Sequence, residues 1–399
     1  MSVVSSIVQQ SKIQIFNKIS KLGLDILDKS RFETSNSFLD PDAILLRSHN
    51  LHDLKFGQSL KAIGRAGAGV NNIPVDECSS RGVVVFNTPG ANANAVKELV
   101  ILALLISSRN IIESVRYVDT IQQLGETIPS LVETNKSRFK GVEIAGKRLA
   151  VIGLGAIGVM VANTASSLGM HVSGYDPFIT VNRAWGLSRN VVQAQNLNAL
   201  LSNSDYVTLH MPLNKQTKYF FDKEHLARLQ PGSILLNFSR PEIVKQGDLV
   251  SALNNKQFSK YVCDFPTDIL IPNPNVIVFP HLGASTQEAE DNCSKMIVTQ
   301  ISEFLSTGNI TNSVNFPDCS MDFSGSFRLS IINKNVPSMV VKISQLIANF
   351  NLNISEMINK SQDSLAYTLV DVVGSYSDQL LKDLHEIDGV IKARVIYPS

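Results

Sequence analysis

Arg240, Asp264 and His281 are polar residues that each stand at the end of a short apolar run. The three runs are residues 233–237, 261–264 and 276–279. Such runs predict buried parallel strands, and an open parallel sheet binds ligands beyond the carboxyl ends of its strands. There an arginine can hold a carboxylate, a histidine can take a hydroxyl proton, and an acid can stabilise the charged histidine. These three residues together favour the oxidation of a hydroxy acid. The alternatives are that the arginine is only a solvated surface residue and that the histidine is not catalytic.

A glycine-rich motif indicates the cofactor. Gly153, Gly155 and Gly158 are spaced as GxGxxG, and Asp176 ends the next apolar run. The first glycine permits a tight turn, the second lets the backbone approach a pyrophosphate, and the third packs helix on strand. Asp176 would accept hydrogen bonds from ribose hydroxyls and repel a 2′-phosphate. The motif predicts NAD rather than NADP, with glycines that serve packing alone as the alternative.

Three regions of the chain must position these residues. The first, to about residue 90, alternates strand-like and helix-like stretches, with strands at 13–16, 43–46 and 83–86 and a helix at 74–81. The second predicts a parallel sheet from strands at 148–152, 170–175, 206–210, 233–237, 261–264 and 276–279, and a helix at 156–168. Helix 95–108 is apolar on nearly every face, which predicts burial between domains or subunits.

The third region begins after a capped helix and a linker. Ser285 and Glu288 form a capping box, and the helical pattern runs to about Leu305 before Gly308 ends it. Residues 327–399 predict a β-α-β-β-α-β unit, which is a ferredoxin-like α+β fold. Its strands are 328–333, 354–359, 366–372 and 391–395, and its helices are 338–348 and 378–387.

Composition narrows the class of protein. The 399 residues carry a net charge of +1 without long basic runs, so we expect no nucleic-acid partner and no binding to a membrane surface. The longest apolar run, 99–106, is too short to span a bilayer, and the N-terminus lacks the apolar stretch of a signal peptide. The four cysteines lack CxxC spacing, which favours reduced thiols in a cytoplasmic protein and no metal site.

Five motifs together show a family resemblance. They are residues 65–72 (RAGAGVNN), 87–94 (NTPGANAN), 153–158 (GLGAIG), 237–240 (NFSR) and 280–286 (PHLGAST). The chain resembles the D-2-hydroxyacid dehydrogenases, and among them the members with a C-terminal ACT domain. The resemblance implies an α/β fold with two Rossmann-like doubly wound domains and a ferredoxin-like ACT domain. It implies these boundaries: substrate-binding domain 1–91 and 284–310, NAD-binding domain 92–283, linker 311–326 and ACT regulatory domain 327–399.

The resemblance also implies roles for individual residues. Arg240 matches the substrate-binding catalytic arginine, His281 the acid/base, and Asp264 the acid near the nicotinamide amide. Residues that match the cofactor side are Gly153, Gly155, Ala156, Ile157, Gly158, Asp176, Phe238, Ser239, Arg240 and Asp264. Residues that match the substrate side are Arg47, Ser48, Arg65 and Gly67. Two arginines there suit a substrate with a phosphate as well as a carboxylate.

The sequence departs from the family pattern at several positions. No Glu stands in the segment 264–268 where the family has the acid that pairs with the histidine, and Asp268 is the expected substitute. Pro241 stands where Gly is usual, which could alter the loop that aims Arg240. In the ACT domain, Ser338 replaces a glycine beside Asn333, Asn335 and Asn353, the residues that match an amino-acid effector site. The alternative is a domain that only associates subunits.

The resemblance implies a specific reaction. We expect NAD-dependent oxidation of 3-phospho-D-glycerate to 3-phosphohydroxypyruvate, the first step of the phosphorylated route to serine. One alternative is another D-2-hydroxyacid dehydrogenase, acting on glycerate, lactate or a related acid. The other is an NAD-binding sensor whose catalysis has decayed, suggested by Pro241 and the missing Glu. Helix 95–108 matches the dimer-forming region of the family, so we expect a homodimer or homotetramer.

Overall fold

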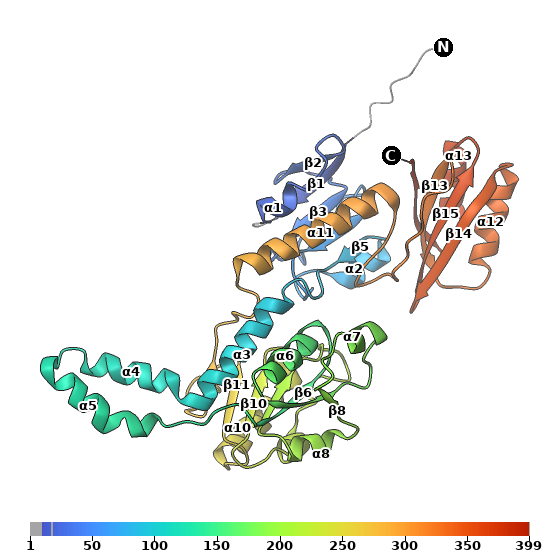
Figure 1. The fold of residues 1–399 in the computed structure, drawn as a ribbon. Helices are drawn as coiled ribbons and strands as arrows, with labels where there is room; N and C mark the ends of the chain where they lie inside the picture. Colours follow the sequence, from blue (N-terminus) through green and yellow to red (C-terminus); the bar gives the residue numbers. More distant parts are fainter. Residues whose placement is uncertain (1–9, 17–18, 399) are drawn as a thin grey trace. The chain divides into compact units, whose positions relative to one another are not determined.

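The computed structural model describes residues 10–16 and 19–398 (Figure 1). It divides the chain into two compact units. One consists of Met1–Asn92 with Gln287–Ser399, and the other is Ala93–Thr286.

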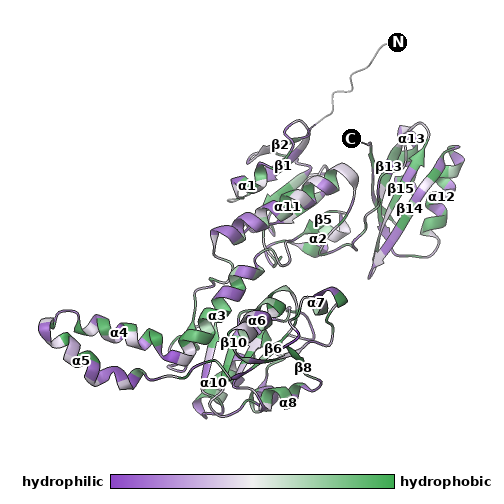
Figure 2. Ribbon diagram, in the orientation of Figure 1, coloured by the Kyte–Doolittle hydropathy of each residue, from purple (hydrophilic) through white to green (hydrophobic). Residues whose placement is uncertain are grey.

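The second unit is built on a seven-stranded, all-parallel sheet of order β12-β11-β10-β9-β6-β7-β8. The strands are β6 Arg148–Ile152, β7 His171–Tyr175, β8 Val192–Gln193, β9 Tyr206–Leu209, β10 Ile234–Asn237, β11 Lys260–Cys263 and β12 Val276–Val278. The helices that connect them are α6 Ala156–Ser167, α7 Val181–Trp185, α8 Leu197–Ser202, α9 Lys223–Leu226, the 3₁₀ turn η3 Pro241–Ile243 and α10 Gln246–Asn254. The central strands are buried and mostly hydrophobic, apart from the exposed Arg148 at the start of β6 (Figure 2). The predicted doubly wound sheet is confirmed, with six strands placed to within one residue.

A long helix and a helical arm precede this sheet. Helix α3, Ala93–Arg109, packs on α6, β10 and β11, and buries Val100, Ala103 and Leu104. Its other face leaves Leu102 and Leu105 46% and 42% exposed, so this chain by itself does not bury the helix on every side. The arm consists of α4 Ile111–Ile121, η1 Gly125–Thr127, α5 Ile128–Asn135 and η2 Lys136–Phe139, and it extends away from the sheet (Figure 1).

The first unit contains a five-stranded parallel sheet of order β2-β1-β3-β4-β5. Its elements are β1 Ser11–Ile15, α1 Lys21–Leu24, β2 Phe32–Ser35, β3 Ala43–Leu46, β4 Ala62–Arg65, α2 Val75–Ser80, β5 Val84–Phe86 and α11 Gln287–Thr307. Helix α11 packs on β3, β4 and β5, although it is far from them in the sequence. A Cβ at Gly64 would lie 2.7 Å from Ile297 and 2.9 Å from Ile301, so glycine permits this close approach. Strands β2 and β4 lie outside the runs that the sequence predicts, and α11 begins at Gln287, after Ser285.

The same unit contains a C-terminal ferredoxin-like domain. Its four antiparallel strands have the order β14-β15-β13-β16. The elements are β13 Phe327–Lys334, α12 Met339–Asn349, β14 Asn353–Gln362, β15 Leu365–Val373, α13 Asp378–Glu386 and β16 Val390–Ile396. The predicted β-α-β-β-α-β order is confirmed, and the strands are longer than the sequence pattern indicates.

This domain holds the C-terminal end of α11. Arg328 is fully buried, pairs with Asp371 at 2.6 Å and donates to the carbonyl of Thr307 at 3.0 Å. Arg394 donates to the carbonyls of Phe304 and Leu305. The last carbonyls of a helix lack partners within the helix, and cations there also interact favourably with the partial negative charge of the helix C-terminus. Two arginines from one sheet therefore cap α11.

The segment 311–326 is irregular but packed. Phe316, Cys319 and Met321 are buried in the core of the first unit, and Ile310 and Cys319 exchange backbone hydrogen bonds. The segment thus contributes core side chains as well as connecting two domains.

Candidate active site

The glycine-rich turn follows β6 and leads into α6. Gly153 has φ = 90°, a conformation that favours glycine, and a Cβ there would lie 2.7 Å from the backbone of His210. A Cβ at Gly158 would lie 1.9 Å from the carbonyl oxygen of Gly153. These two glycines therefore permit close packing of the backbone. Gly155 differs, because a Cβ built there has no atom within 4 Å. The open space beside Gly155, at the N-terminus of α6, is suited to a pyrophosphate.

Asp176 follows β7 and holds this turn. Its Oδ2 accepts the backbone N–H of Leu154 and its Oδ1 that of Phe178, each at 2.8 Å. A carboxylate oxygen can accept a second hydrogen bond, so both remain able to bind a ribose hydroxyl. Ala156 and Ile157 form the first turn of α6, where backbone N–H groups are available to a phosphate. The donors, the acid and the space fit a dinucleotide.

The loop that carries Arg240 is fixed by side-chain hydrogen bonds at the end of β10. Asn237, fully buried, donates to the carbonyl of Arg240 at 2.9 Å and accepts the N–H of Ser239 at 3.1 Å. The Oγ of Ser239 donates to the carbonyl of Leu209 at 2.6 Å. Ser239 and Arg240 are thus held between the ends of β9 and β10.

Pro241 fits this loop without distorting it. It is the first residue of η3, where a backbone N–H has no helical partner to lose. Arg240 before it is extended, at φ = −145° and ψ = 143°, the region that a residue before proline prefers. Phe238 is buried and its ring lies 6.0 Å from that of Phe279, so its side chain belongs to the core. Only its backbone is available to a cofactor.

His281 stands in a strained turn after β12. Its φ of 57° is in the left-handed region, which costs a non-glycine residue free energy and is typical of functional positions. The ring is exposed and meets the edge of Phe265, with centroids 5.4 Å apart and planes at 73°. This side chain is open to a substrate.

Asp264 is the acid that holds the His281 turn. Its Oδ1 accepts the N–H of Leu282 and its Oδ2 that of Gly283, each at 2.7 Å. Burial raises the pKa of Asp264, while these N–H groups and the charge of His281 oppose that rise. Asp264 therefore contacts the backbone of the His281 turn directly.

Asp268 does not take the place expected for it. It is exposed in the turn after Thr267 and forms neither a hydrogen bond nor an ion pair with His281, both of which lie in the described part of the chain. The segment after β11 leads Asp268 to the surface, whereas Asp264 stays at the strand end. In this structure the histidine turn is held by Asp264.

Arg47 and Arg65, expected on the substrate side, meet in the first unit. Arg65 ends β4, and its Nε donates to the carbonyl of Arg47, just after β3, at 3.1 Å. Asn72 donates to the same carbonyl at 3.3 Å and to that of His49 at 2.7 Å. Asn72, the last residue of the motif 65–72, thus ties the Arg47 loop to this motif, a contact that sequence reasoning did not predict.

Two further substrate-side expectations lie in the same loops. Ser48 is exposed next to Arg47. Gly67 has φ = 154°, and a Cβ there would lie 2.5 Å from Nη1 of Arg65. Glycine at 67 thus leaves room for the Arg65 side chain.

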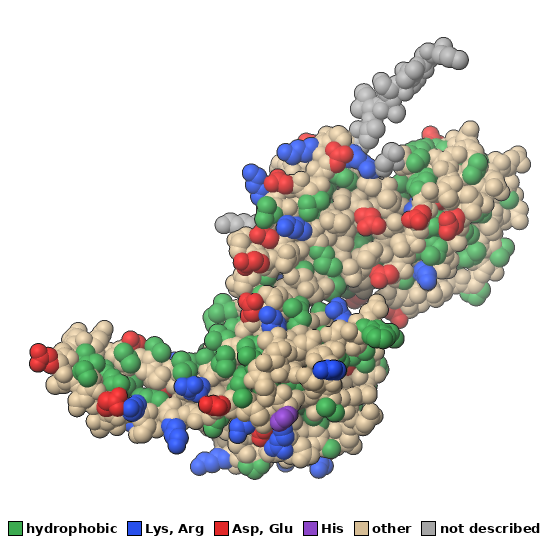
Figure 3. Space-filling view, viewed as in Figure 1, with side chains coloured by type: hydrophobic (Ala, Val, Ile, Leu, Met, Phe, Trp, Pro, Cys, Tyr) green, Lys and Arg blue, Asp and Glu red, His purple; other side chains and the backbone are tan. Residues whose placement is uncertain are grey.

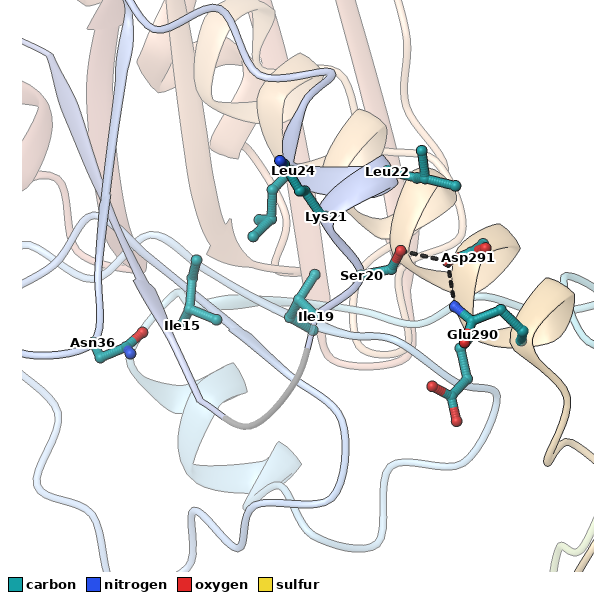
Figure 4. Close-up of a pocket in the computed structure, with 10 residues that line it drawn as sticks. Ile15, Ile19, Ser20, Lys21, Leu22, Leu24, Asn36, Glu290 and Asp291 are labelled. Atoms are coloured by element: carbon teal, nitrogen blue, oxygen red, sulfur yellow. Dashed lines mark hydrogen bonds between the residues drawn. The ribbon is translucent and has the colours of Figure 1, made fainter.

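Glu290, in the first turns of α11, forms an ion pair with Arg47. No local motif indicates this contact, because the two residues come from distant segments. Glu290 and the neighbouring Asp291 border a cavity of about 650 Å³ (Figure 4). Asp291 is bound there by Ser20 and by Gln287, the latter at 3.1 Å.

Comparison with known proteins identifies the family. Residues 101–283 match the family model of the D-isomer specific 2-hydroxyacid dehydrogenase, NAD binding domain. A D-3-phosphoglycerate dehydrogenase of Haemophilus influenzae is 31% identical over 98% of this chain and 95% of its own. The chain belongs to the D-isomer-specific 2-hydroxyacid dehydrogenase family. It is similar to its D-3-phosphoglycerate dehydrogenase members, and one from Methanocaldococcus jannaschii is 30% identical over 82% of this chain and 61% of its own.

A solved structure agrees with this assignment. The NAD⁺-bound 3-phosphoglycerate dehydrogenase of Entamoeba histolytica matches with a TM-score of 0.61 and 27% identity, covering 77% of this chain and 99% of the other. This 2-hydroxyacid dehydrogenase is thus an NAD-dependent oxidoreductase, and the turn at Gly153–Gly158 and Asp176 belong to its NAD-binding domain.

The C-terminal domain of this dehydrogenase has a small cavity of about 170 Å³. Asn333, Asn335, Ser338 and Asn359 are among the residues that line it. The Oδ1 of Asn333 is buried and has no hydrogen-bond partner within the described structure. Asn353 begins β14 opposite Val373, whereas Asn333 lies opposite Ala366, so one copy of the chain does not bring Asn353 to this cavity. Asn359, which sequence reasoning missed, lines the cavity instead.

Two features are absent from the described residues of the dehydrogenase. No helix among them is long and apolar enough to cross a membrane. Within residues 10–16 and 19–398, no three His, Cys, Asp or Glu side chains gather as they would around a metal ion. All four cysteines are unpaired and buried.

Proposed function

We propose that this dehydrogenase oxidises 3-phospho-D-glycerate to 3-phosphohydroxypyruvate with NAD, the first step of the phosphorylated route to serine. The observation that supports a phosphorylated substrate is the hydrogen bond from Arg65 to the carbonyl of Arg47. This bond brings two arginines together. A pair of arginines suits a phosphate dianion. The names of the similar enzymes support the same substrate.

The chemistry follows from the residues at the strand ends. Bound NAD supplies the hydride acceptor. Arg240 holds the substrate carboxylate and polarises the carbonyl group that forms at C2. His281 takes the proton of the C2 hydroxyl as the C2 hydride leaves, and Asp264 stabilises the charged histidine and holds its turn. Reduction of the keto acid reverses each step. Asp264 is thus proposed as a positioning residue.

Initial rates of NADH consumption with phosphohydroxypyruvate test this function. We expect turnover, with D-glycerate and D-lactate as much poorer substrates in the oxidative direction. Preference for either unphosphorylated acid would point to another 2-hydroxyacid dehydrogenase. NADH binding by fluorescence without any turnover would instead favour the sensor.

We further propose that the C-terminal domain is an ACT regulatory domain that binds a small amino acid. Three asparagines line its cavity, and the unpartnered Oδ1 of Asn333 can accept a hydrogen bond from an ammonium group. Added serine should lower the rate, and Asn333→Ala should abolish that effect. If neither serine nor another amino acid changes the rate, the C-terminal domain would serve only to associate subunits.

We also propose that the enzyme works as a homo-oligomer in the cytoplasm. The arm and α3 expose apolar side chains, among them Leu102, Leu105, Val115 and Val118 (Figure 3). Exposed apolar patches of this kind mark interfaces between proteins. Light scattering should give at least a dimer, and Val115→Glu with Val118→Glu should yield monomers. The unpaired cysteines fit a reducing compartment.

A further inference from the structure

Arg47 is already neutralised in the first unit. Its Nη1 forms an ion pair with the Oε1 of Glu290, and the two side chains are 32% and 40% exposed. A bound phosphate would need the same guanidinium. Glu290 therefore occupies the group that the proposed substrate requires.

The ion pair is not what holds the loop of Arg47. The carbonyl of Arg47 accepts hydrogen bonds from Nε of Arg65 and Nδ2 of Asn72, and β3 ends at the preceding residue. These bonds fix the backbone, so the Arg47 side chain can turn from Glu290 to a ligand without moving the loop.

Glu290 is the acid of its segment that is placed for this role. Asp291 is bound by Ser20 and Gln287 (Figure 4), whereas Glu288 is exposed. Burial raises the pKa of the Cys293 thiol, which lies on the same helix as Glu290; the charges of Arg47 and Arg65 lower it, and that of Glu290 raises it.

We propose that Glu290 is a displaceable counter-ion of Arg47, which the phosphate of the substrate expels. This inference rests on the proposed function, because it assigns the phosphate to Arg47. A dianion attracts Arg47 more strongly than a carboxylate does, but Glu290 must be separated from Arg47 and remains as a nearby like charge. Glu290 thus weakens phosphate binding and raises the KM for the phosphorylated substrate.

The test uses the full-length enzyme and inorganic phosphate as the probe. Glu290→Gln removes the competing charge and should lower the Kd for phosphate about three- to fivefold, the range expected for a partly exposed ion pair. Glu288→Gln, a matched change two residues away on another face of the same helix, should leave the Kd unchanged. Arg47→Met should abolish tighter binding in the double variant with Glu290→Gln. Melting temperatures confirm that each variant folds.

Kinetics supply a second readout. With 3-phospho-D-glycerate, Glu290→Gln should lower KM by the same factor and leave kcat alone, and Glu290→Asp should restore the original KM. D-Glycerate, which lacks the phosphate, should not respond. Phosphate binding equal in Glu290→Gln and Glu288→Gln overturns the inference even if the enzyme oxidises phosphoglycerate. If Glu290→Gln binds phosphate more tightly but the enzyme does not oxidise 3-phospho-D-glycerate, Glu290 is the counter-ion of Arg47 and the proposed substrate is wrong.

Discussion

Asp264 holds the turn that carries His281 through both of its carboxylate oxygens. Each oxygen accepts one backbone N–H, from the two residues that follow the histidine, at 2.7 Å. This arrangement stabilises the positive φ of His281, a conformation that a histidine adopts only where the surroundings enforce it. The acid and the histidine therefore form one unit, in which the acid determines where the imidazole lies.

Replacing this acid should be costly, whereas replacing Asp268 should not. Asp264→Asn puts an NH₂ group against a backbone N–H, so we expect a loss of about 1–3 kcal/mol in the free energy of unfolding and at least about tenfold in kcat. Asp268→Asn changes the same charge at an exposed position and should alter neither much. Urea denaturation and steady-state rates compare the two. A larger loss of kcat in Asp268→Asn would restore it as the histidine's partner.

Removing the imidazole tests the base. His281→Asn should lower kcat by roughly 100-fold or more, as loss of a general base does. Binding of NADH, measured by fluorescence, should stay close to that of the unchanged enzyme because the glycine-rich turn is intact. Normal turnover in this variant would place the base elsewhere.

The two glycines of the NAD turn should respond differently to the same change. Gly155→Ala adds a methyl group to open space, so the protein should fold normally and bind NADH less tightly. Gly158→Ala puts the methyl group 1.9 Å from the carbonyl oxygen of Gly153 and should destabilise the domain. Melting temperature and NADH titration together separate these effects. Equal melting temperatures for the two variants would contradict the packing role of Gly158.

Ser338, beside the C-terminal cavity, adopts a backbone conformation that is unfavourable for a serine. It precedes α12 with φ = 68°, which glycine adopts at little cost. Ser338→Gly should raise the free energy of unfolding by about 1 kcal/mol. Ser344→Gly, in the middle of the same helix, should lower it by a similar amount. Urea denaturation measures both, and destabilisation by Ser338→Gly would show that the serine side chain has a structural role.

Lys392 should give the protein a recognisable pH dependence. It donates to the carbonyl of Leu60, and burial, aided by cationic neighbours, lowers its pKa to about 8. Those neighbours are Lys61, Arg394 and Arg81, with Asp40 opposing them. Below pH 8 the amine is charged in both states, and the folded state bears the full cost. Between about pH 8 and 10.5 only the unfolded state keeps the proton, so the free energy of unfolding rises with pH.

Two lysine variants isolate that contribution. Lys392→Met should remove the rise, whereas Lys382→Met, at an exposed position of the same domain, should keep it. Urea denaturation across this pH range measures the slope. Identical slopes in the two variants would mean that other groups produce it.

Local patterns were enough for the elements that carry the NAD motif. Strand β6 and the start of α6 coincide with the predicted bounds, because the buried residues of the strand, 149–152, form a continuous apolar run with glycine after it. No element is predicted at 111–139. The helices there bury little within this chain, since α4 buries only Ile121 and α5 buries no residue. Strand β2, with the sequence FETS, is buried only at Phe32.

The site divides in the same way. Motifs located Arg240, His281, Arg47 and Arg65, because each stands in a recognisable local sequence. The contacts between segments could not be read from any motif. The choice of Asp264 over Asp268 depends on how the chain turns after β11, and the pairing of Glu290 with Arg47 depends on the packing of α11 against β3.

The length of helix α11 also determines the direction in which Glu290 points relative to the C-terminal end of the helix. Its 21 residues span about 31 Å, with Glu290 near one end and the carbonyls held by Arg394 near the other. Successive residues are turned by about 100°, so the number of residues between these ends determines the direction in which Glu290 points once the arginines have clamped the carbonyls. A single inserted residue in the middle of the helix would rotate Glu290 away from Arg47 while leaving both ends chemically intact. The number of residues in α11 therefore determines both the distance between its ends and the direction in which Glu290 points.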